Sequence, residues 1–311
     1  MKENHPEIKL DELIMVEPPY CILQDLKLMD DGSITGKVFN EYQPQDEGGP
    51  IAGAEFGRHI AILGSIALAN ALQHNHSHYF LAVRANIKRE TPDVYRFDEL
   101  SLYAKPSKLE KRKGKIYGEI YGQNNELINT AKVDYMILER EVFSKVYERH
   151  KKENSIENKV SPYIKRRHLT NIVIDGHTAR AEFGTILKNE CEGHFRHFPA
   201  LPVALIGGLF GELGYELFKH NLPGYDTIIS PRTDIKAHGL VFSGEHLHFA
   251  GRISQWISDD AILITAEALV SDDVVADVSF ILKGVKLTKE KSSRKKKFQK
   301  IIRRYNPFAK S

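Results

Sequence analysis

The chain carries an internal repeat, and this feature constrains its fold more than any other. Residues 85–88 (ANIK) are echoed by residues 233–236 (TDIK). An alternating segment follows each of them, at residues 99–104 and 245–250, and alternation of apolar and polar residues predicts a strand. Two more pairs of segments keep the same order along the chain: 116–121 with 264–269, and 133–138 with 278–282. The shared order predicts two structurally similar units.

A glycine-containing apolar stretch precedes the strands of each half, at residues 50–72 and at residues 202–218. Both stretches predict helices, and the second is apolar enough to be buried on every side. Glu55, Arg58 and Glu212 interrupt the stretches, so neither predicts a membrane span. A chain of 311 residues is about as long as two ordinary domains, so each half has enough sequence for its own core.

The region between the halves, residues 140–167, is densely charged and predicts an exposed helix followed by a linker. We therefore expect an N-terminal domain over residues 1–140, a charged linker over 141–160, a C-terminal domain over 161–283 and a basic tail over 284–311. Two cysteines, Cys21 and Cys191, are too few for a disulfide framework. The first eleven residues are polar and charged, unlike a signal peptide. Both observations predict a cytoplasmic protein.

The C-terminal end of the chain differs in charge from the rest. Residues 283–311 contain twelve Lys and Arg residues and one acidic residue, whereas the remainder contains 32 basic and 40 acidic residues. Basic and apolar residues interleave over 294–305, as they do in amphipathic helices. Either this tail is a solvated extension, or it associates with an anionic membrane or an acidic carrier protein. Nucleic acid is not an expected partner, because the body of the chain has no companion basic motif.

The segment 191–202 (CEGHFRHFPALP) holds the residue best suited to chemistry, His194. Gly193, Pro199 and Pro202 restrict the backbone around this histidine just before the second helical stretch. The start of a helix offers unpaired N–H groups, which can polarise a carbonyl and hold developing negative charge. A histidine placed there can act as a base. A plain structural role, such as a hydrogen bond within the loop, is the alternative.

This segment resembles the motif of the bacterial 3-hydroxyacyl-acyl-carrier-protein dehydratases, which carry Gly-His-Phe, a loop with two prolines, and an apolar helix bearing a carboxylate. The matching residues are Gly193, His194, Phe195, Pro199 and Pro202. The chain departs from the motif at Val203, where the family has a glycine, and at Gly208, where the family has its acid. The resemblance implies an α+β double hot-dog fold, with two antiparallel sheets each wrapped around a central helix.

The repeat supplies a candidate for the missing acid. Aligning residues 56–57 with residues 210–211 sets Asn40 against His194 and brings Glu55 within one residue of the position that lacks its carboxylate. In the dehydratases, each site takes its histidine from one subunit and its acid from the helix of the partner. The resemblance therefore implies one composite site of His194 and Glu55, with the site at Asn40 inactive. Alternatively, Glu55 is a solvated carboxylate near a helix start, where negative charge is favourable.

The implied reaction is dehydration of a 3-hydroxyacyl thioester to its trans-2-enoyl form, or the reverse hydration. His194 would remove the proton next to the thioester carbonyl, and Glu55 would position or protonate the departing hydroxyl. The residues expected to contact the substrate are Gly53, Gly193, Phe195, Pro199, Pro202 and Val203. The reaction needs no metal ion and no redox cofactor, and no metal site is expected.

The expected partner is an acyl thioester carried by an acyl-carrier protein or by coenzyme A. Two other functions fit the same residues. One is an acyl thioesterase, in which Glu55 or another carboxylate activates water and His194 assists. The other is a non-catalytic module that binds acyl thioesters, which the departures at Val203 and Gly208 favour.

Overall fold

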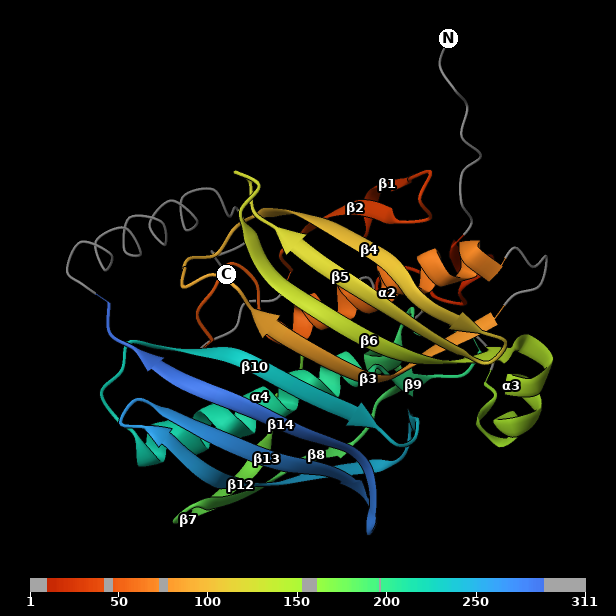
Figure 1. Cartoon of the computed structure of the whole chain (residues 1–311). Coiled ribbons are helices and arrows are strands. Elements are labelled where there is room, and N and C mark those ends of the chain that lie inside the picture. The colour runs from red at the N-terminus through yellow and green to blue at the C-terminus, as the bar shows by residue number, and fades with distance from the viewer. Residues whose placement is uncertain (1–9, 42–46, 73–77, 153–160, 196, 288–311) are drawn as a thin grey trace, which may run out of the picture.

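A computed structural model describes residues 10–41, 47–72, 78–152, 161–195 and 197–287 of the chain (Figure 1). The described part contains two units of the same kind, each with one long helix inside a curved antiparallel sheet. Figure 1 colours the first unit red to yellow and the second green to blue. The structure confirms the predicted α+β class and the predicted central helix in each half.

The first half is built around helix α2. Its elements are α1 (Leu10–Leu13), β1 (Gln24–Leu28), β2 (Ile34–Phe39), α2 (Gly53–Leu72), β3 (His78–Arg89), β4 (Glu99–Glu110), β5 (Lys113–Tyr121) and β6 (Leu127–Glu139). α2 is apolar around most of its circumference, and Phe56 and Leu63 are fully buried. β4 alternates as its sequence predicts, with Leu100 and Leu102 on the inner face of the sheet.

The second half repeats this arrangement around helix α4. It begins after α3 (Arg140–Val146) and the 3₁₀ turn η1 (Glu148–His150), and it comprises β7 (Thr170–Asp175), β8 (Thr178–Thr185), η2 (Lys188–Cys191), β9 (Ala200–Leu201), α4 (Val203–Asn221), β10 (Thr227–Ala237), β11 (Val241–Phe242), β12 (His246–Ser258), β13 (Ala261–Val270) and β14 (Asp273–Val285). α4 begins directly after Pro202, and its last turn carries Lys219 and His220, which suit the negative end of the helix dipole.

The two expected sheets are halves of one continuous ladder of twelve strands. The strand order is β1-β2-β4-β5-β6-β3-β10-β14-β13-β12-β8-β7, and β9 pairs separately with β11. β3 and β10 form the seam, because they pair antiparallel over five residues from Arg232 opposite Lys88 to Lys236 opposite Arg84. The repeated segments 85–88 and 233–236 therefore lie side by side, which their similarity alone did not predict.

An ion pair crosses the seam on its exposed face. Arg84 Nε donates to Asp234 Oδ1 at 2.9 Å, and Arg84 Nη2 donates to Asp234 Oδ2 at 2.6 Å. Because both groups are partly exposed to solvent, this bidentate pair adds little stability. The pair matches the register of the two strands, since a shift of one residue would separate the Arg84 guanidinium from the Asp234 carboxylate.

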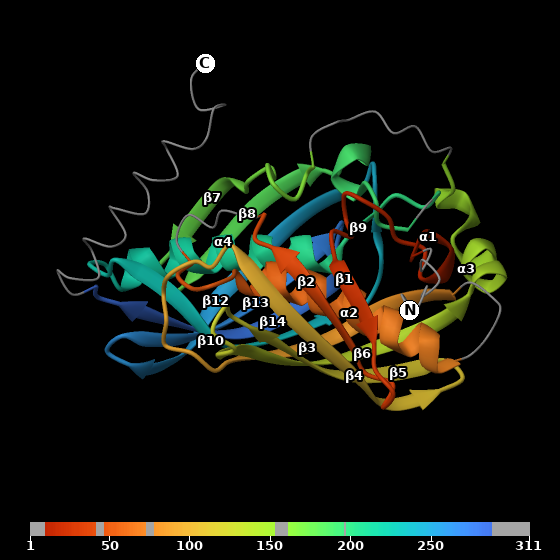
Figure 2. The same cartoon turned by 90° about the horizontal axis from the view of Figure 1, so that it is seen from above.

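α2 and α4 lie next to each other inside the curve of the sheet (Figures 1 and 2). Small side chains allow the close approach. A Cβ atom at Gly207 would lie 4.0 Å from the Cβ of Ala54, and one at Gly208 would lie 3.6 Å from it. Each helix also fills the core of its own half, so the molecule has two apolar cores that meet where the helices touch.

Some predicted segments fall partly or wholly outside the described residues. α3 and η1 occupy the start of the expected linker, whereas residues 153–160 lie outside the described part. The expected basic tail also lies outside it beyond residue 287. Within the described residues, no helix combines the length and the apolar character needed to cross a membrane.

Replacing Leu63 with alanine tests the core of the first half. The Leu63 side chain is fully buried in α2, so Leu63→Ala removes apolar contacts and leaves a cavity. We expect the free energy of unfolding to fall by about 2–5 kcal/mol in urea denaturation. Val146→Ala is the matched control, because Val146 is 59% exposed, and its effect should stay within about 0.5 kcal/mol. Equal effects of the two changes would contradict the packing described for α2.

Candidate functional site

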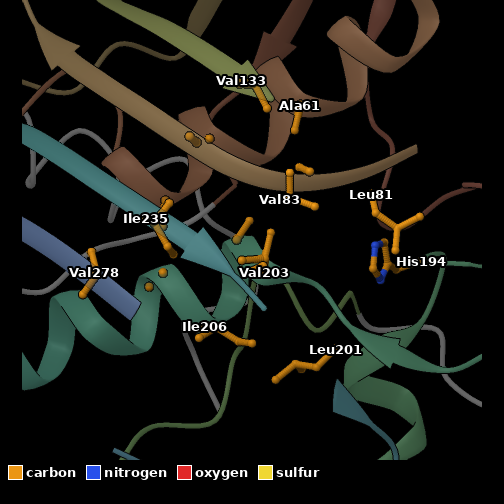
Figure 3. A pocket seen from close by; sticks show the side chains of 18 of the residues that line it. Ala61, Leu81, Val83, Val133, His194, Leu201, Val203, Ile206, Ile235 and Val278 are labelled. Carbon is orange, nitrogen blue, oxygen red and sulfur yellow. The ribbon is translucent and has the colours of Figure 1, made fainter. Parts of the chain in front are cut away.

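A cavity runs between the two central helices and the seam strands. Its volume is about 170 Å³, roughly ten times the space that one water molecule needs. Small and aliphatic side chains line its middle, among them Ala61, Val83, Val133, Val203, Ile206, Ile235 and Val278 (Figure 3). A narrow apolar lining of this kind suits an alkyl chain.

His194 lies at one end of this cavity, beside Leu81 and Leu201 (Figure 3). Its Nδ1 lies 2.8 Å from the carbonyl oxygen of Ala200. A carbonyl oxygen only accepts hydrogen bonds, so Nδ1 carries the proton and Nε2 keeps a free lone pair in the neutral ring. Burial lowers the pKa of His194 to about 4, although the bond to Ala200 opposes the shift. The imidazole is therefore neutral near pH 7, as a base must be.

The N-terminal segment of the first half holds the His194 loop. Val16 and His194 form an antiparallel bridge, and Glu17 N donates to the carbonyl of Gly193 at 2.9 Å. Gly193 has a φ of +78°, and a Cβ atom there would lie 2.6 Å from Tyr20 N and closer still to Glu17 O. Only glycine fits this approach of two backbones. The glycine of the motif thus serves to dock the loop on the other half of the chain.

Aromatic rings fix the orientation of the imidazole. The ring of His194 stacks on Phe195 with centroids 3.9 Å apart, and Tyr20 lies against it at 4.8 Å. Phe195 in turn meets Tyr79 and Phe143 edge-on, at 5.2 and 5.5 Å. These contacts restrain the ring in addition to the hydrogen bond from Nδ1, so Nε2 has a defined direction.

The start of α4 opens on the same cavity. Pro202 is the N-cap residue, and no side chain caps the helix there. Val203 and Ala204, the first two residues of the helix, both line the cavity. The first N–H groups of a helix have no partner within it, so they are available to a carbonyl oxygen. The hydrogen bond from His194 to Ala200 ties the imidazole to the residues that lead into this helix start.

The predicted substrate-contacting residues divide into two groups. Gly53, Phe195 and Val203 line the cavity. Gly193, Pro199 and Pro202 do not line it and instead shape the loop. Pro199 O accepts a hydrogen bond from Ser243 N at 2.9 Å, and Pro202 O accepts one from Leu205 N at 2.9 Å.

Glu55 lies on a different face of α2 from the residues that line the cavity. The lining residues of α2 are Gly53, Ala54, Gly57, Ala61, Ile62 and Ser65. Glu55 shares the other face with Arg58 and His59, three and four residues further along the helix. Its Oε1 accepts a hydrogen bond from Glu41 N at 2.6 Å and lies 3.7 Å from His59 Nε2. Burial raises the pKa of Glu55, but His59, the Glu41 N–H and the Arg58 charge outweigh it and lower the pKa overall.

The structure therefore does not place His194 and Glu55 at the same cavity. The position that lacks its acid and Glu55 differ by one residue in the repeat, and one residue turns a helix by about 100°. Ala54 faces the cavity, whereas Glu55 enters a buried ionic cluster with Arg58 and Glu41. Among the described residues of α2, those lining the cavity include no carboxylate that could serve as the acid of a dehydratase.

Glu47, which the sequence analysis did not single out, is the one carboxylate among the described residues that line the cavity. Its Oε1 accepts a hydrogen bond from Gly53 N, the first residue of α2, at 2.9 Å. Burial raises the pKa of Glu47, while this bond and one from the Tyr215 hydroxyl oppose the shift. The sequence does contain a signal for Glu47, because it lies just before Pro50 and the predicted helix, and a carboxylate is favourable at a helix start.

The pseudo-symmetric position opposite α4 holds no base. The Asn40 amide donates to the carbonyl oxygens of Pro50 at 2.5 Å and Phe97 at 2.6 Å, a structural role. At Gly208, a Cβ atom would collide with the Arg166 guanidinium. Within the described residues, no group of three or more His, Cys, Asp and Glu side chains is arranged to hold a metal ion.

Comparison with known proteins gives a fold but no family. No protein-family model matches the chain, and no curated protein matches its sequence. Solved structures do match it. A provisionally assigned oleoyl thioesterase from Lactobacillus plantarum is 10% identical, with a TM-score of 0.57 over 84% of this chain and 100% of its own. A hot-dog protein of unknown function from Alicyclobacillus acidocaldarius is 13% identical, with a TM-score of 0.50 over 91% and 100%. The 12:0-ACP thioesterase from Umbellularia californica is 8% identical, with a TM-score of 0.52 over 86% and 100%.

The chain has the double hot-dog fold. The resemblance to dehydratases predicted this fold, and the matching structures confirm it. The predicted dehydratase reaction is wrong, because two of the matching structures just described are named as acyl thioesterases and neither as a dehydratase. The cavity agrees with this correction, since the helix facing His194 brings no acid to it. The motif identified the loop and its histidine. The reaction also depends on the residues that the facing helix brings to the cavity, and these differ here from the dehydratase pattern.

Replacing Gly193 with alanine tests how the loop is docked. Gly193→Ala adds a Cβ against the backbone of Glu17 and Tyr20 and imposes a positive φ on alanine, so we expect a loss of about 2–5 kcal/mol in thermal or urea unfolding. Gly176→Ala is the control. Gly176 also has a positive φ, of +54°, but no atom lies within 4 Å of its added Cβ, so only the backbone cost of about 1–2 kcal/mol applies. A Gly193 effect no larger than the control would contradict the contact.

The buried ionic cluster of α2 predicts how stability depends on pH. Burial, together with the charge of Arg58, lowers the pKa of His59 from 6.5 to about 4. Between these values the unfolded chain binds a proton that the folded chain does not, so stability is lost as pH falls from about 6.5 to about 4. The contribution of His59 is about 3 kcal/mol over that window.

We expect His59→Asn to reduce the slope of the free energy of unfolding against pH, measured by urea denaturation at a series of pH values. The readout is this slope and not the absolute stability. His194 titrates in the same window and leaves part of the slope in place. His246→Asn is the control, because His246 is exposed on β12. An unchanged slope in His59→Asn would show that His59 is protonated in the folded protein.

Proposed function

We propose that this protein hydrolyses fatty acyl thioesters at the end of the cavity that holds His194. The observation that carries the proposal is the neutral imidazole of His194, with Nδ1 bound to Ala200 O and Nε2 free, at one end of an apolar cavity. The thioesterases that share the fold support it. The acyl chain would occupy the cavity, and the thiol-bearing arm would extend toward the surface.

His194 acts as the general base in this proposal. Nε2 accepts a proton from a water molecule while the water oxygen attacks the thioester carbonyl carbon. The positive charge on the imidazolium is stabilised by the hydrogen bond from Nδ1 to Ala200 O, because a carbonyl oxygen accepts more strongly from a charged donor. A pKa of about 4 makes His194 a weak base in the free protein, and the bound oxyanion would raise its proton affinity.

The N–H groups at the start of α4 hold the oxyanion that forms on the carbonyl oxygen. Val203 and Ala204 supply these groups at the wall of a mainly apolar cavity, where such donors contribute more than they do in water. The tetrahedral intermediate then expels the thiolate. His194 returns the proton to the thiolate sulfur, so the products are a free fatty acid and a free thiol, and the imidazole is neutral again.

Incubating the protein with a series of saturated acyl-coenzyme A thioesters, octanoyl to stearoyl, tests the proposal. A thiol reagent follows the released coenzyme A, and mass spectrometry identifies the free acid. We expect His194→Gln to lower kcat by about 100-fold or more, which is typical for the loss of a general base. His246→Gln, at an exposed histidine of β12, should leave kcat unchanged.

The other outcomes are equally informative. When 3-hydroxyacyl and 2-enoyl thioesters are added to the series, loss or gain of water without thiol release would contradict hydrolysis. Binding of the thioesters without turnover by the wild-type protein would favour the non-catalytic module. Equal rates for wild-type protein and His194→Gln would assign the activity to another residue.

A further inference from the structure

The end of the cavity away from His194 is polar. Four side chains with hydrogen-bonding groups line it: Glu47, Tyr215, Ser230 and Thr233. Most of the remaining lining residues are glycine, alanine and aliphatic residues (Figure 3), and Ser65 and Tyr135 on α2 and β6 add two further hydroxyl groups. Hydrolysis at His194 uses none of these four groups. A cavity built only for a saturated alkyl chain has no use for them, because polar groups facing a methyl end lose their hydration.

The strands and α4 place this polar end far from His194. Tyr215 follows Val203 by twelve residues of α4, which is about 18 Å along the helix axis. Glu47 forms a bridge with Ile228, near the first residue of β10, whereas Leu240, beyond the last residue of β10, lines the opposite end. In Figure 3, His194 and Leu81 lie on one side of the cavity and Val278 on the other. A long acyl chain is needed to connect the two ends.

The polar end is built from both halves of the chain and is held in place. Glu47 Oε1 accepts from Gly53 N at 2.9 Å, and the Tyr215 hydroxyl donates to the Glu47 carboxylate. Arg89 Nη1 donates to Gly48 O at 2.8 Å, which anchors the residue next to Glu47. Across the cavity wall, the Ser230 and Thr233 hydroxyls lie 3.0 Å apart. Rigid support of this kind is what a specific binding subsite requires.

The repeat relates one lining residue at each end of the cavity. Aligning residues 56–57 with 210–211 sets Glu47 against Leu201, and both residues line the cavity, at opposite ends. Leucine at the His194 end accepts the alkyl chain near the thioester. Glutamate at the equivalent position of the other end replaces an apolar contact with a hydrogen-bonding one.

We propose that Glu47, Tyr215, Ser230 and Thr233 form a subsite for a hydroxyl group at the distal end of a long acyl chain. The inference rests on the proposed function and names its substrate class, an acyl thioester with a terminal or near-terminal hydroxyl. A hydroxyl can donate to the Glu47 carboxyl group and accept from a neighbouring hydroxyl. Glu47 and the nearby Arg89 and Arg166 already place charges of both signs at this end, and a neutral hydroxyl needs no counter-ion there.

Calorimetric binding of non-hydrolysable alkyl thioethers of coenzyme A tests the subsite. Two series from octyl to stearyl are compared, one saturated and one with a terminal hydroxyl. We expect the hydroxyl to improve Kd by about tenfold at the chain length that reaches the far end, and to weaken binding of shorter chains. Tyr215→Phe and Glu47→Leu should each abolish the improvement, and thermal unfolding verifies that both variants fold. Tyr117→Phe, which removes a hydroxyl from β5 bonded to Glu119, should leave it unchanged.

The outcomes separate this inference from the proposed function. No preference for the hydroxyl at any chain length, or a preference that survives both variants, would overturn the subsite. Failure of both series to bind would overturn it as well. Thiol release from saturated acyl-coenzyme A measures hydrolysis independently. Hydroxyl-dependent binding without thiol release would support the subsite and contradict the proposed hydrolysis. Thiol release without a preference for the hydroxyl would support hydrolysis and contradict the subsite.

Discussion

The pairing of β3 with β10 is the interaction on which the rest of the structure depends. Five residue pairs, from Arg232 opposite Lys88 to Lys236 opposite Arg84, join two curved half-sheets into one ladder. Since each half-sheet wraps its own helix, the seam also brings α2 and α4 together. Ala54 and Gly208 are small enough for the helices to touch, and the space left between helices and seam strands is the cavity. The fold and the cavity both follow from this one junction.

The two halves are alike in backbone but have divided their roles. The second half carries His194, and the equivalent Asn40 of the first half ties its amide to two carbonyl groups instead. The first half contributes the surface on which the His194 loop rests, through Val16 and Glu17. Neither half contains the whole site.

The resemblance to dehydratases was informative about the loop and misleading about the reaction. A loop with Gly-His-Phe and two prolines directs a histidine toward a helix start, and the bond from His194 to Ala200 shows that geometry. The reaction, however, depends on what the opposite helix presents. α2 turns Gly53 and Ala54 toward the cavity and Glu55 into a cluster with Arg58. A local motif contains no information about that rotation, because the rotation is set by helix packing.

The sequence by itself determined the two helices, the repeated strand segments that follow each helix and the position of His194 before α4, because these depend on short-range periodicity and on glycine and proline. Only the tertiary structure decided that the sheets fuse, that Gly193 docks on Glu17 and Tyr20, and that Glu47 lines the cavity. These features join residues far apart in the chain. Their geometry follows from which side chains fit together across the two halves, and that complementarity of shape has no signature in the spacing of residues.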